Sequence, residues 1–201
     1  WALTSMKGAS MSVAITASDG SSDRQLTWVS AFDPGRSAAE SFIQQIYLSA
    51  FSASVETFSP RIAGLRDRAS VWVAAAGCRY AHDGPLYLER YLDEAVELAL
   101  SRISGETVLR KDIVEVGQLA ASRAGEGKRL IYQLHESLAD QGYKWAVCTF
   151  TRELRRLFFQ MGVAPMVLAA ASPEKGTDTQ NQWGDYYKHQ PVVVAGRLGC
   201  L

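Results

Sequence analysis

The sequence lacks an excess of either charge, since its 201 residues carry 21 basic and 21 acidic side chains. A protein that binds nucleic acid through the phosphates usually carries a basic excess, so we expect no nucleic-acid partner. The sequence also lacks an apolar run near the ~20 residues of a membrane-spanning helix. The best candidate, "SVWVAAAGC", is too short. We therefore expect no integral membrane segment.

Cysteine and histidine are scarce. The three cysteines are an odd number at wide spacing, and Cys78 and Cys148 lie within apolar, strand-like runs. This usage favours a reduced, cytoplasmic protein over a disulfide framework. No histidine is near Cys148 in the sequence, so we interpret this thiol as structural. The three histidines show no metal-ligand spacing, and no metal site is expected.

The remaining composition is that of a globular protein, with 47% hydrophobic and 21% charged residues. A chain of this length buries roughly 70% of its unfolded surface, which is enough for a core without cross-links. Residues 1–10, "WALTSMKGAS", precede Met11 and are interpreted as an expression remnant outside the fold. Residues 11–201 are expected to form a single domain.

Strand-like and helix-like patterns alternate along the chain. Helical spacing of apolar residues predicts helices within residues 33–54, 125–142 and 151–162, the last one capped by Thr151. A short extended piece and a helix ending near Gly105 are expected within residues 84–105. Strands are expected within residues 11–18, 24–32, 60–67, 70–84, 112–120, 143–151, 164–172 and 191–198. The pattern predicts an α/β or α+β sheet with helices on its faces.

The turn "SRAGEGKR", residues 122–129, joins a predicted strand to a predicted helix. Free backbone N–H groups at a helix start attract anions, and glycines allow a ligand to approach the backbone closely. The glycine spacing matches neither a Walker loop nor a dinucleotide fingerprint. A phosphate site and an ordinary solvated helix start are about equally compatible with these residues.

The segment "LAASRAGEGKRLIYQL" resembles the N-acetyltransferase-like (GNAT) superfamily, whose signature is Gln/Arg-x-x-Gly-x-Gly/Ala. Ser122 stands at its first position and Gly125 and Gly127 at its glycines. The resemblance implies a mixed, mostly antiparallel central sheet with helices on both faces. It also implies that this loop holds the pyrophosphate of an acyl-CoA or the phosphopantetheine of an acyl carrier protein. The expected donor-binding residues are Leu119, Ala120, Arg123, Gly125, Glu126, Gly127, Lys128 and Arg129.

A more extensive resemblance covers residues 60–198. In order, "LYLERYLDEAVE", "IVEVGQLA", "CTFTRELRRLFFQMGVAP" and "QWGDYYKHQPVVVAGRL" resemble the thermostable hemolysin family, an acyltransferase-like group. Two departures stand out. The family usually has Asn where this chain has Gln118, and Phe-Leu-Glu-Gln where this chain has residues 87–90.

An acyltransferase needs a base for its acceptor, and two carboxylates are candidates. Glu115 lies in an apolar strand, where burial would raise its pKa towards the range that suits a base. The alternative is a structural carboxylate paired with Arg79 or Arg110. Glu89 is the second candidate, as a base or as a ligand for the acceptor's ammonium group; its alternative is a solvated edge position.

Several other side chains are assigned to substrate. Trp183, Tyr186 and Tyr187 lie in a polar loop, where they either cover an acceptor pocket or form a small satellite cluster. The expected acceptor-binding residues are Arg79, Gln118, Thr149, Trp183, Tyr186 and Tyr187. Phe158 and Phe159 stand where the superfamily often has a tyrosine acid, so the thiolate leaves unassisted or Tyr186 or Tyr187 substitutes.

The leading hypothesis is transfer of an acyl group from acyl-CoA or an acyl carrier protein to the amine of a small, amino acid-like acceptor. A more distant resemblance to acyl-homoserine-lactone synthases implies a longer acyl chain. Residues proposed to line its pocket are Trp145, Phe150, Phe158, Phe159 and Met161. The alternative hypothesis is an inactive GNAT-like protein that acts on membranes or binds a partner.

Overall fold

The computed structural model describes residues 2–3, 25–175 and 182–199. Within them, eight strands form one sheet in the order β2-β3-β4-β5-β6-β8-β7, with β1 pairing beside β5. Only the β5–β6 and β1–β5 pairs are parallel. The strands are β1 (Ala2–Leu3), β2 (Thr27–Val29), β3 (Arg61–Arg66), β4 (Trp72–Tyr80), β5 (Ile113–Ala121), β6 (Trp145–Phe150), β7 (Met166–Ala170) and β8 (Val192–Arg197).

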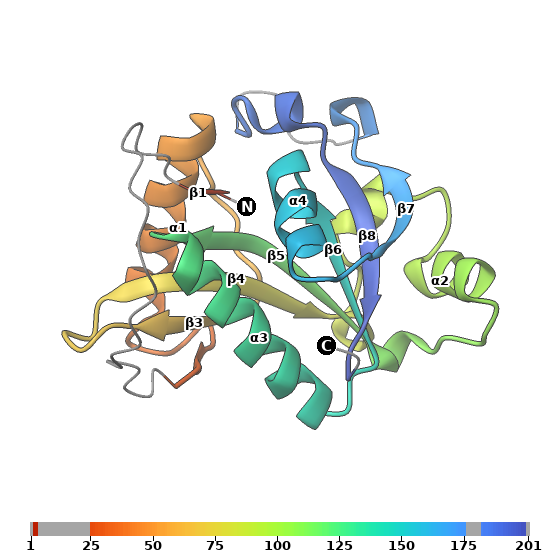
Figure 1. The fold of residues 1–201 in the computed structure, drawn as a ribbon, viewed down its shortest axis with the longest axis horizontal. Helices are drawn as coiled ribbons and strands as arrows, with labels where there is room; N and C mark the ends of the chain where they lie inside the picture. Colours follow the sequence, from red (N-terminus) through yellow and green to blue (C-terminus); the bar gives the residue numbers. More distant parts are fainter. Residues whose placement is uncertain (1, 4–24, 176–181, 200–201) are drawn as a thin grey trace.

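Helices cover both faces of this sheet (Figure 1). The α-helices are α1 (Arg36–Phe51), α2 (Val96–Ser104), α3 (Ala124–Asp140) and α4 (Arg152–Gln160). The 3₁₀-helices are η1 (Ala81–Asp83), η2 (Tyr87–Tyr91), η3 (Arg110–Asp112), η4 (Pro173–Lys175) and η5 (Tyr186–His189). α3 and α4 pack on one face, and α1 and α2 on the other. The predicted mixed, mostly antiparallel sheet is confirmed.

Strand alternation decides which side chains face which helices. On β5, Val114 and Val116 pack with α3 and α4, whereas Ile113 packs with α2 on the opposite face. Successive side chains of a strand point to opposite faces, so Glu115 lies on the same face as Ile113. A polar side chain is thus placed on the α1/α2 face among the apolar residues 113, 114 and 116 of β5.

Two expectations need comment. The extended piece expected before α2 is wrong, because residues 87–91 form η2. Glu89 sets this local structure, since its Oε2 accepts a hydrogen bond from Leu86 N at 2.7 Å. The strand expected at residues 11–18 lies outside the described residues, as do residues 4–10. Ala2 and Leu3 pair in parallel with Ala120 and Ala121 of β5.

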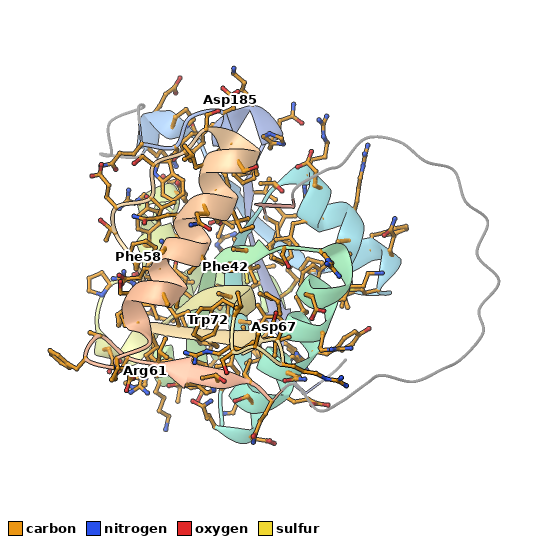
Figure 2. The ribbon with its side chains drawn as sticks, turned by 90° about the vertical axis from the view of Figure 1, so that its left-hand side faces the viewer. Phe42, Phe58, Arg61, Asp67, Trp72 and Asp185 are labelled. Atoms are coloured by element: carbon orange, nitrogen blue, oxygen red, sulfur yellow. The ribbon has the colours of Figure 1, made fainter. Side chains whose placement is uncertain are left out.

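The aromatic loop before β8 is fastened to the end of α1. Asp185 N donates to Phe51 O at 2.7 Å, and Figure 2 shows Asp185 beside this end of α1. The contact requires glycine at position 184, where φ is +48° and an added Cβ would lie 2.2 Å from Phe51 O. Close packing and backbone conformation together therefore explain the Trp-Gly pair of this loop.

We expect Gly184→Ala to destabilise the protein by at least ~2 kcal/mol, which lowers Tm by roughly 4–8 °C, because it adds a steric clash to an unfavourable φ. Gly105→Ala is the matched control. Its φ is +74°, but an added Cβ there meets no atom within 4 Å. The control should cost only about 1 kcal/mol. Equal shifts in thermal unfolding for both variants would contradict the close contact at Gly184.

Candidate active site

The strands β5 and β6 separate near the middle of the sheet. They pair only from Ile113 to Glu115 on β5 and from Trp145 to Val147 on β6. Beyond this point β5 continues beside β4, while β6 continues beside β8. Among the described strands, the edge of β5 that faces β6 therefore has no partner at residues 116–119, and β1 pairs with it at Ala120 and Ala121.

A β-bulge accompanies the separation. Gly117 pairs with Gly77 and Ala120 with Ala75, so two residues of β5 oppose one residue of β4. On β4 the register shift lies between Ala75 and Gly77. Gln118 takes the strained position, with φ of +51°. Asn tolerates this conformation better than most residues, which accounts for the Asn that the resembling family usually has here.

Gln118 joins the bulge to the chain segment that precedes β3. Its Oε1 accepts from Ser59 N at 3.1 Å, and its Nε2 donates to Thr57 O at 2.7 Å. Ser59 also lies against Gly77, where an added Cβ would be 2.6 Å from Ser59 Oγ. The side chain proposed to contact substrate thus also holds residues 57–59 over the bulge.

A polar cavity of about 290 Å³ lies on the α1/α2 side of the separation. This volume is close to the lower end of ligand sites, about 300 Å³. Its walls come from residues 54–59, β4, β5, η2, β6 and residues 182–186. Phe58, which Figure 2 labels, contributes to one wall. Segments far apart in the sequence therefore meet at one site.

Glu115 lies in this cavity and is 6% exposed. Its Oε2 accepts from Tyr87 N at 2.7 Å, and its Oε1 accepts from Leu88 N at 2.9 Å. Burial raises the pKa of Glu115 to about 7, against the opposing effects of the two N–H donors and Arg79. A carboxyl with this pKa exchanges protons readily near neutral pH.

Arg79 stands opposite Glu115 on β4 and lines the same cavity. Its Nε lies 3.9 Å from Glu115 Oε2, which is too long for a hydrogen bond. Within the described residues, this buried Nε has no hydrogen-bond acceptor. Arg79 is therefore the neighbour that was expected for Glu115, but Arg79 Nε remains available to donate a hydrogen bond to a ligand.

The expected pairing of Glu115 with Arg110 is wrong, because Arg110 binds Glu89 and Glu97 instead. Arg110 Nη1 lies 2.7 Å from Glu89 Oε1 and 2.8 Å from Glu97 Oε2. Its Nε and Nη2 donate to the carbonyls of Ala81 and Gly84. Arg110 thus fixes the segment that includes η2.

The environment of Glu89 argues against the role of base. Partial burial alone would raise its pKa, but hydrogen bonds from Arg110, Leu86 N and Val96 N lower the pKa to about 2. Its side chain is absent from the described lining of the polar cavity. Glu89 is an ionised structural group. The alternative expectation for Glu89, a solvated edge position, is also wrong. Glu89 shapes η2, whose N–H groups hold Glu115.

The other acceptor-binding candidates divide into two groups. Thr149, Trp183 and Tyr186 line the polar cavity, together with Arg79 and Gln118. Tyr187 is not among its lining residues, because its hydroxyl lies 2.8 Å from that of Tyr91. The loop aromatics also pack against one another, with the Trp183 and Tyr186 rings tilted by 48° and their centroids 5.4 Å apart. They form a cluster and a cavity wall at once.

A second cavity of about 290 Å³ lies on the opposite face, between α3 and α4. Its lining is mainly apolar and includes Phe150 and Phe158, as expected for an acyl pocket. Phe159 is 79% exposed, and Trp145 packs with α2 on the other face, so neither lines this cavity. Leu119 lines both cavities. Leu119, beside the bulge, therefore borders a cavity on each face of the sheet.

The turn before α3 has the features of an anion site. Arg123 is the N-cap residue and makes no side-chain cap, and Gly127 N is bonded to Arg123 O at 3.2 Å. The amides of the first turn lack intrahelical acceptors. Gly125, Lys128 and the N-cap are exposed, and Arg129 lies 3.9 Å from Glu126. Ala120, which was also expected to bind the donor, has its side chain buried in the hydrophobic cluster that includes α1.

Sequence reasoning missed part of the polar cavity. Residues 54–59, Tyr91, Arg90 and Gln182 all line it. No local pattern identifies them, because they reach the site through contacts such as Ser54 N to Gln182 O at 2.8 Å. Among the described residues, no group of three or more His, Cys, Asp or Glu is placed to hold a metal ion, and no helix has the length and hydropathy of a membrane span.

The raised pKa of Glu115 predicts a pH dependence of stability. Between its usual pKa of 4.5 and about 7, the folded protein retains a proton that the unfolded chain releases. Stability therefore falls as pH rises through this window and is constant above it. Relative to Glu115→Gln, we expect the wild type to lose about 2.5 kcal/mol between pH 5 and 8. Urea unfolding of both proteins measures this difference, and the opposite slope would show that the N–H donors dominate.

Solved structures with the same fold include several acyltransferases. FeeM, an N-acyl amino acid synthase from uncultured soil microbes, aligns with a TM-score of 0.57 at 15% identity, covering 88% of this chain and 92% of that one. The AHL synthase LasI aligns at 0.53 and 10% identity, with the same coverages. A putative N-acetyltransferase from Lactobacillus plantarum aligns at 0.53 and 13% identity, covering 87% and 99%. These likenesses show the GNAT-like fold.

Sequence comparison is more specific. No curated protein matches the chain. The thermostable hemolysin family, in contrast, matches residues 29–200. This match extends over most of the sequence and includes β5, the bulge, α4 and the aromatic loop. The chain belongs to the thermostable hemolysin family.

Proposed function

We propose that this protein is an acyltransferase that moves an acyl group from acyl-CoA or an acyl carrier protein to the amine of a small, amino acid-like acceptor. The observation that carries the proposal is the buried Glu115 at the opening between β5 and β6, beside Arg79 in a ligand-sized cavity. The fold supports it, since FeeM and LasI are synthases that share this architecture. Residues 11–201 are proposed to form the single catalytic domain.

Glu115 acts as the general base. A thioester supplies the activated acyl carbon, and the acceptor's amine attacks it. As the C–N bond forms and the C–S bond breaks, the amine proton passes to Glu115 and the sulfur leaves as a thiolate. A pKa of about 7 suits this step, because the carboxylate is present near neutral pH and still accepts a proton. A thiol of ordinary pKa, about 8.5, is a sufficient leaving group without a tyrosine acid.

The donor's phosphate groups are proposed to bind at the turn before α3. The first-turn amides supply donors, while Arg123 and Lys128 supply positive charge. Gly125 leaves the approach clear, since an added Cβ there meets no atom within 4 Å. Leu119 then lies between this turn and Glu115 along β5, and Ala120 contributes through its backbone.

The acceptor is proposed to bind in the polar cavity through its charged ends. The unpaired Nε of Arg79 is suited to a carboxylate, whereas Glu115 supplies negative charge for an amine. Trp183 and Tyr186 form an apolar wall for its side chain. An amino acid carries both a carboxylate and an amine, so it is suited to this arrangement of positive and negative groups.

A thiol-release assay with a panel of acyl donors and amino acids tests the proposal. Glu115→Gln should reduce kcat by at least ~100-fold, because the base is lost. In the wild type, kcat/KM should rise with pH up to about 7 and then level off.

Glu56→Gln is the matched control, since Glu56 lines the same cavity and binds Gln182 Nε2 at 3.0 Å. It should retain kcat within about 3-fold. Absence of thiol release with every donor, or full activity in Glu115→Gln, would refute the proposal.

The exposed face of α4 offers a way to separate the two donor classes. Arg152 and Arg156 are exposed beside Phe159, which is 79% exposed. A carrier protein with an acidic surface would meet this face through charge complementarity. Free acyl-CoA would not need it.

We expect Arg152→Glu/Arg156→Glu to lower kcat/KM for an acyl carrier protein by about 10-fold at low salt and to leave acyl-CoA turnover unchanged. Arg68→Glu is the control, because Arg68 is exposed in the β3–β4 connection. Steady-state rates with both donors at two salt concentrations provide the measurement. An unchanged rate with the carrier protein would exclude α4 as its docking face.

A further inference from the structure

The edge of β5 that faces β6 has an unpaired part and an occupied part. Residues 116–119 of this edge have no partner among the described strands. At Ala120 and Ala121, the edge is occupied by β1, whose residues Ala2 and Leu3 pair with it in parallel. β1 lies beside the end of β5 that leads to α3 (Figure 1). A segment far from β5 in the sequence therefore covers part of the edge that β6 leaves.

β1 takes the place that β6 would have if the parallel pair continued. β6 is parallel to β5, and so is β1. The opposite edge of β5 is already used at these residues, because β4 pairs with both Ala120 and Ala121. β6 itself pairs with β8 from Trp145 to Phe150. β1 therefore uses backbone groups of β5 that no other described strand uses.

The occupied edge lies on the path proposed for the donor. The donor's phosphates are proposed to bind at the turn that follows β5, and its thioester to lie beside Glu115. The arm between them then runs along β5 past Ala121, Ala120 and Leu119. An extended chain with amide groups pairs with a strand edge through main-chain hydrogen bonds, as a further strand does. β1 and the donor's arm therefore compete for the same backbone groups.

β1 is short enough to be displaced reversibly. It has two residues, whereas β4 pairs with β5 from Val114 to Ala121. A hydrogen bond contributes little net stability, because its groups bond to water when they separate. Opening of β1 therefore costs little and leaves the pairing of β5 with β4 intact. The contact has the properties of a reversible block rather than of a permanent part of the sheet.

We propose that β1 is an autoinhibitory strand that covers Ala120 and Ala121 and leaves this edge when the donor binds. The inference rests on the proposed acyltransferase function and adds a regulatory contact to the same site. If the open state has a population of about 10%, the observed affinity for the donor is about 10-fold weaker than that of the open state. Changes that prevent β1 from pairing should therefore strengthen donor binding, whereas changes that fix β1 in place should prevent it.

Binding of 4′-phosphopantetheine, measured by isothermal titration calorimetry, tests the inference, because both donor classes carry this group. Ala2→Pro/Leu3→Pro, made in the full chain, removes both backbone N–H groups of β1 and with them its donors to β5. We expect this variant to bind the probe about 10-fold more tightly than the wild type. Ala2→Ser/Leu3→Val is the matched control. It changes the same side chains but keeps both N–H groups, so it should bind as the wild type does.

A disulfide tests the same contact in the opposite direction. Leu3 and Ala121 are Cα partners, and adjacent strands lie about 4.8 Å apart, which is within the Cα–Cα range of a disulfide. Oxidised Leu3→Cys/Ala121→Cys should hold β1 on the edge and lower the affinity for the probe by at least about 10-fold. Reduction with dithiothreitol should restore the wild-type affinity, which would show that the two substitutions alone have not damaged the fold.

Equal affinity of the wild type and the proline variant, no binding to either, or undiminished binding to the oxidised cysteine variant would overturn the inference. Thiol release from a donor, together with equal affinities, would leave the proposed function standing and remove only the block. Tighter binding to the proline variant without thiol release from any donor would instead overturn the proposed function, and β1 would remain a block on phosphopantetheine binding.

Discussion

The early separation of β5 from β6 is the constraint on which the rest of the site depends. A parallel pair that continued to the ends of both strands would close the sheet, and neither cavity would reach Leu119. The bulge at Gln118 bends β5 away, while antiparallel pairing with β8 holds β6 in place. The opening is thus maintained by hydrogen bonds on its two outer sides, so it does not require a ligand to keep it open.

Glu89 and Glu115 show how one residue type acquires two roles. The guanidinium of Arg110 contacts Glu89 directly and keeps it ionised. The guanidinium of Arg79 is too far from Glu115 to cancel the rise in pKa that burial causes. The two are also mechanically connected. The bonds of Glu89 shape η2, and the N–H groups of η2 orient the carboxyl of Glu115. The structural carboxylate of Glu89 therefore positions the carboxyl group that is proposed as the base.

The sequence predicted features that depend on local chemistry. The amphipathic helices and the cap at Thr151 follow from residue pattern. Features that depend on contacts between residues far apart in the sequence were predicted poorly. Arg110 pairs with Glu89 rather than with Glu115, and residues 54–59 and 182–186 close the cavity. Both features depend on tertiary contacts that periodicity does not encode. The 3₁₀ conformation of residues 87–91 was missed because a short segment has too few residues for a clear period.

Because the aromatic loop binds the end of α1 from far along the sequence, the parts of the polar cavity come together in a fixed order during synthesis. The polar cavity takes walls from residue 47 at one extreme and residue 186 at the other, and β8 must insert between β6 and β7. Such long-range closure is slow compared with helix formation. A nascent chain that has completed β5 already carries Glu115 and the turn before α3, yet it lacks Trp183, Tyr186 and β8. The polar cavity therefore closes late, once β8 has joined the sheet between β6 and β7.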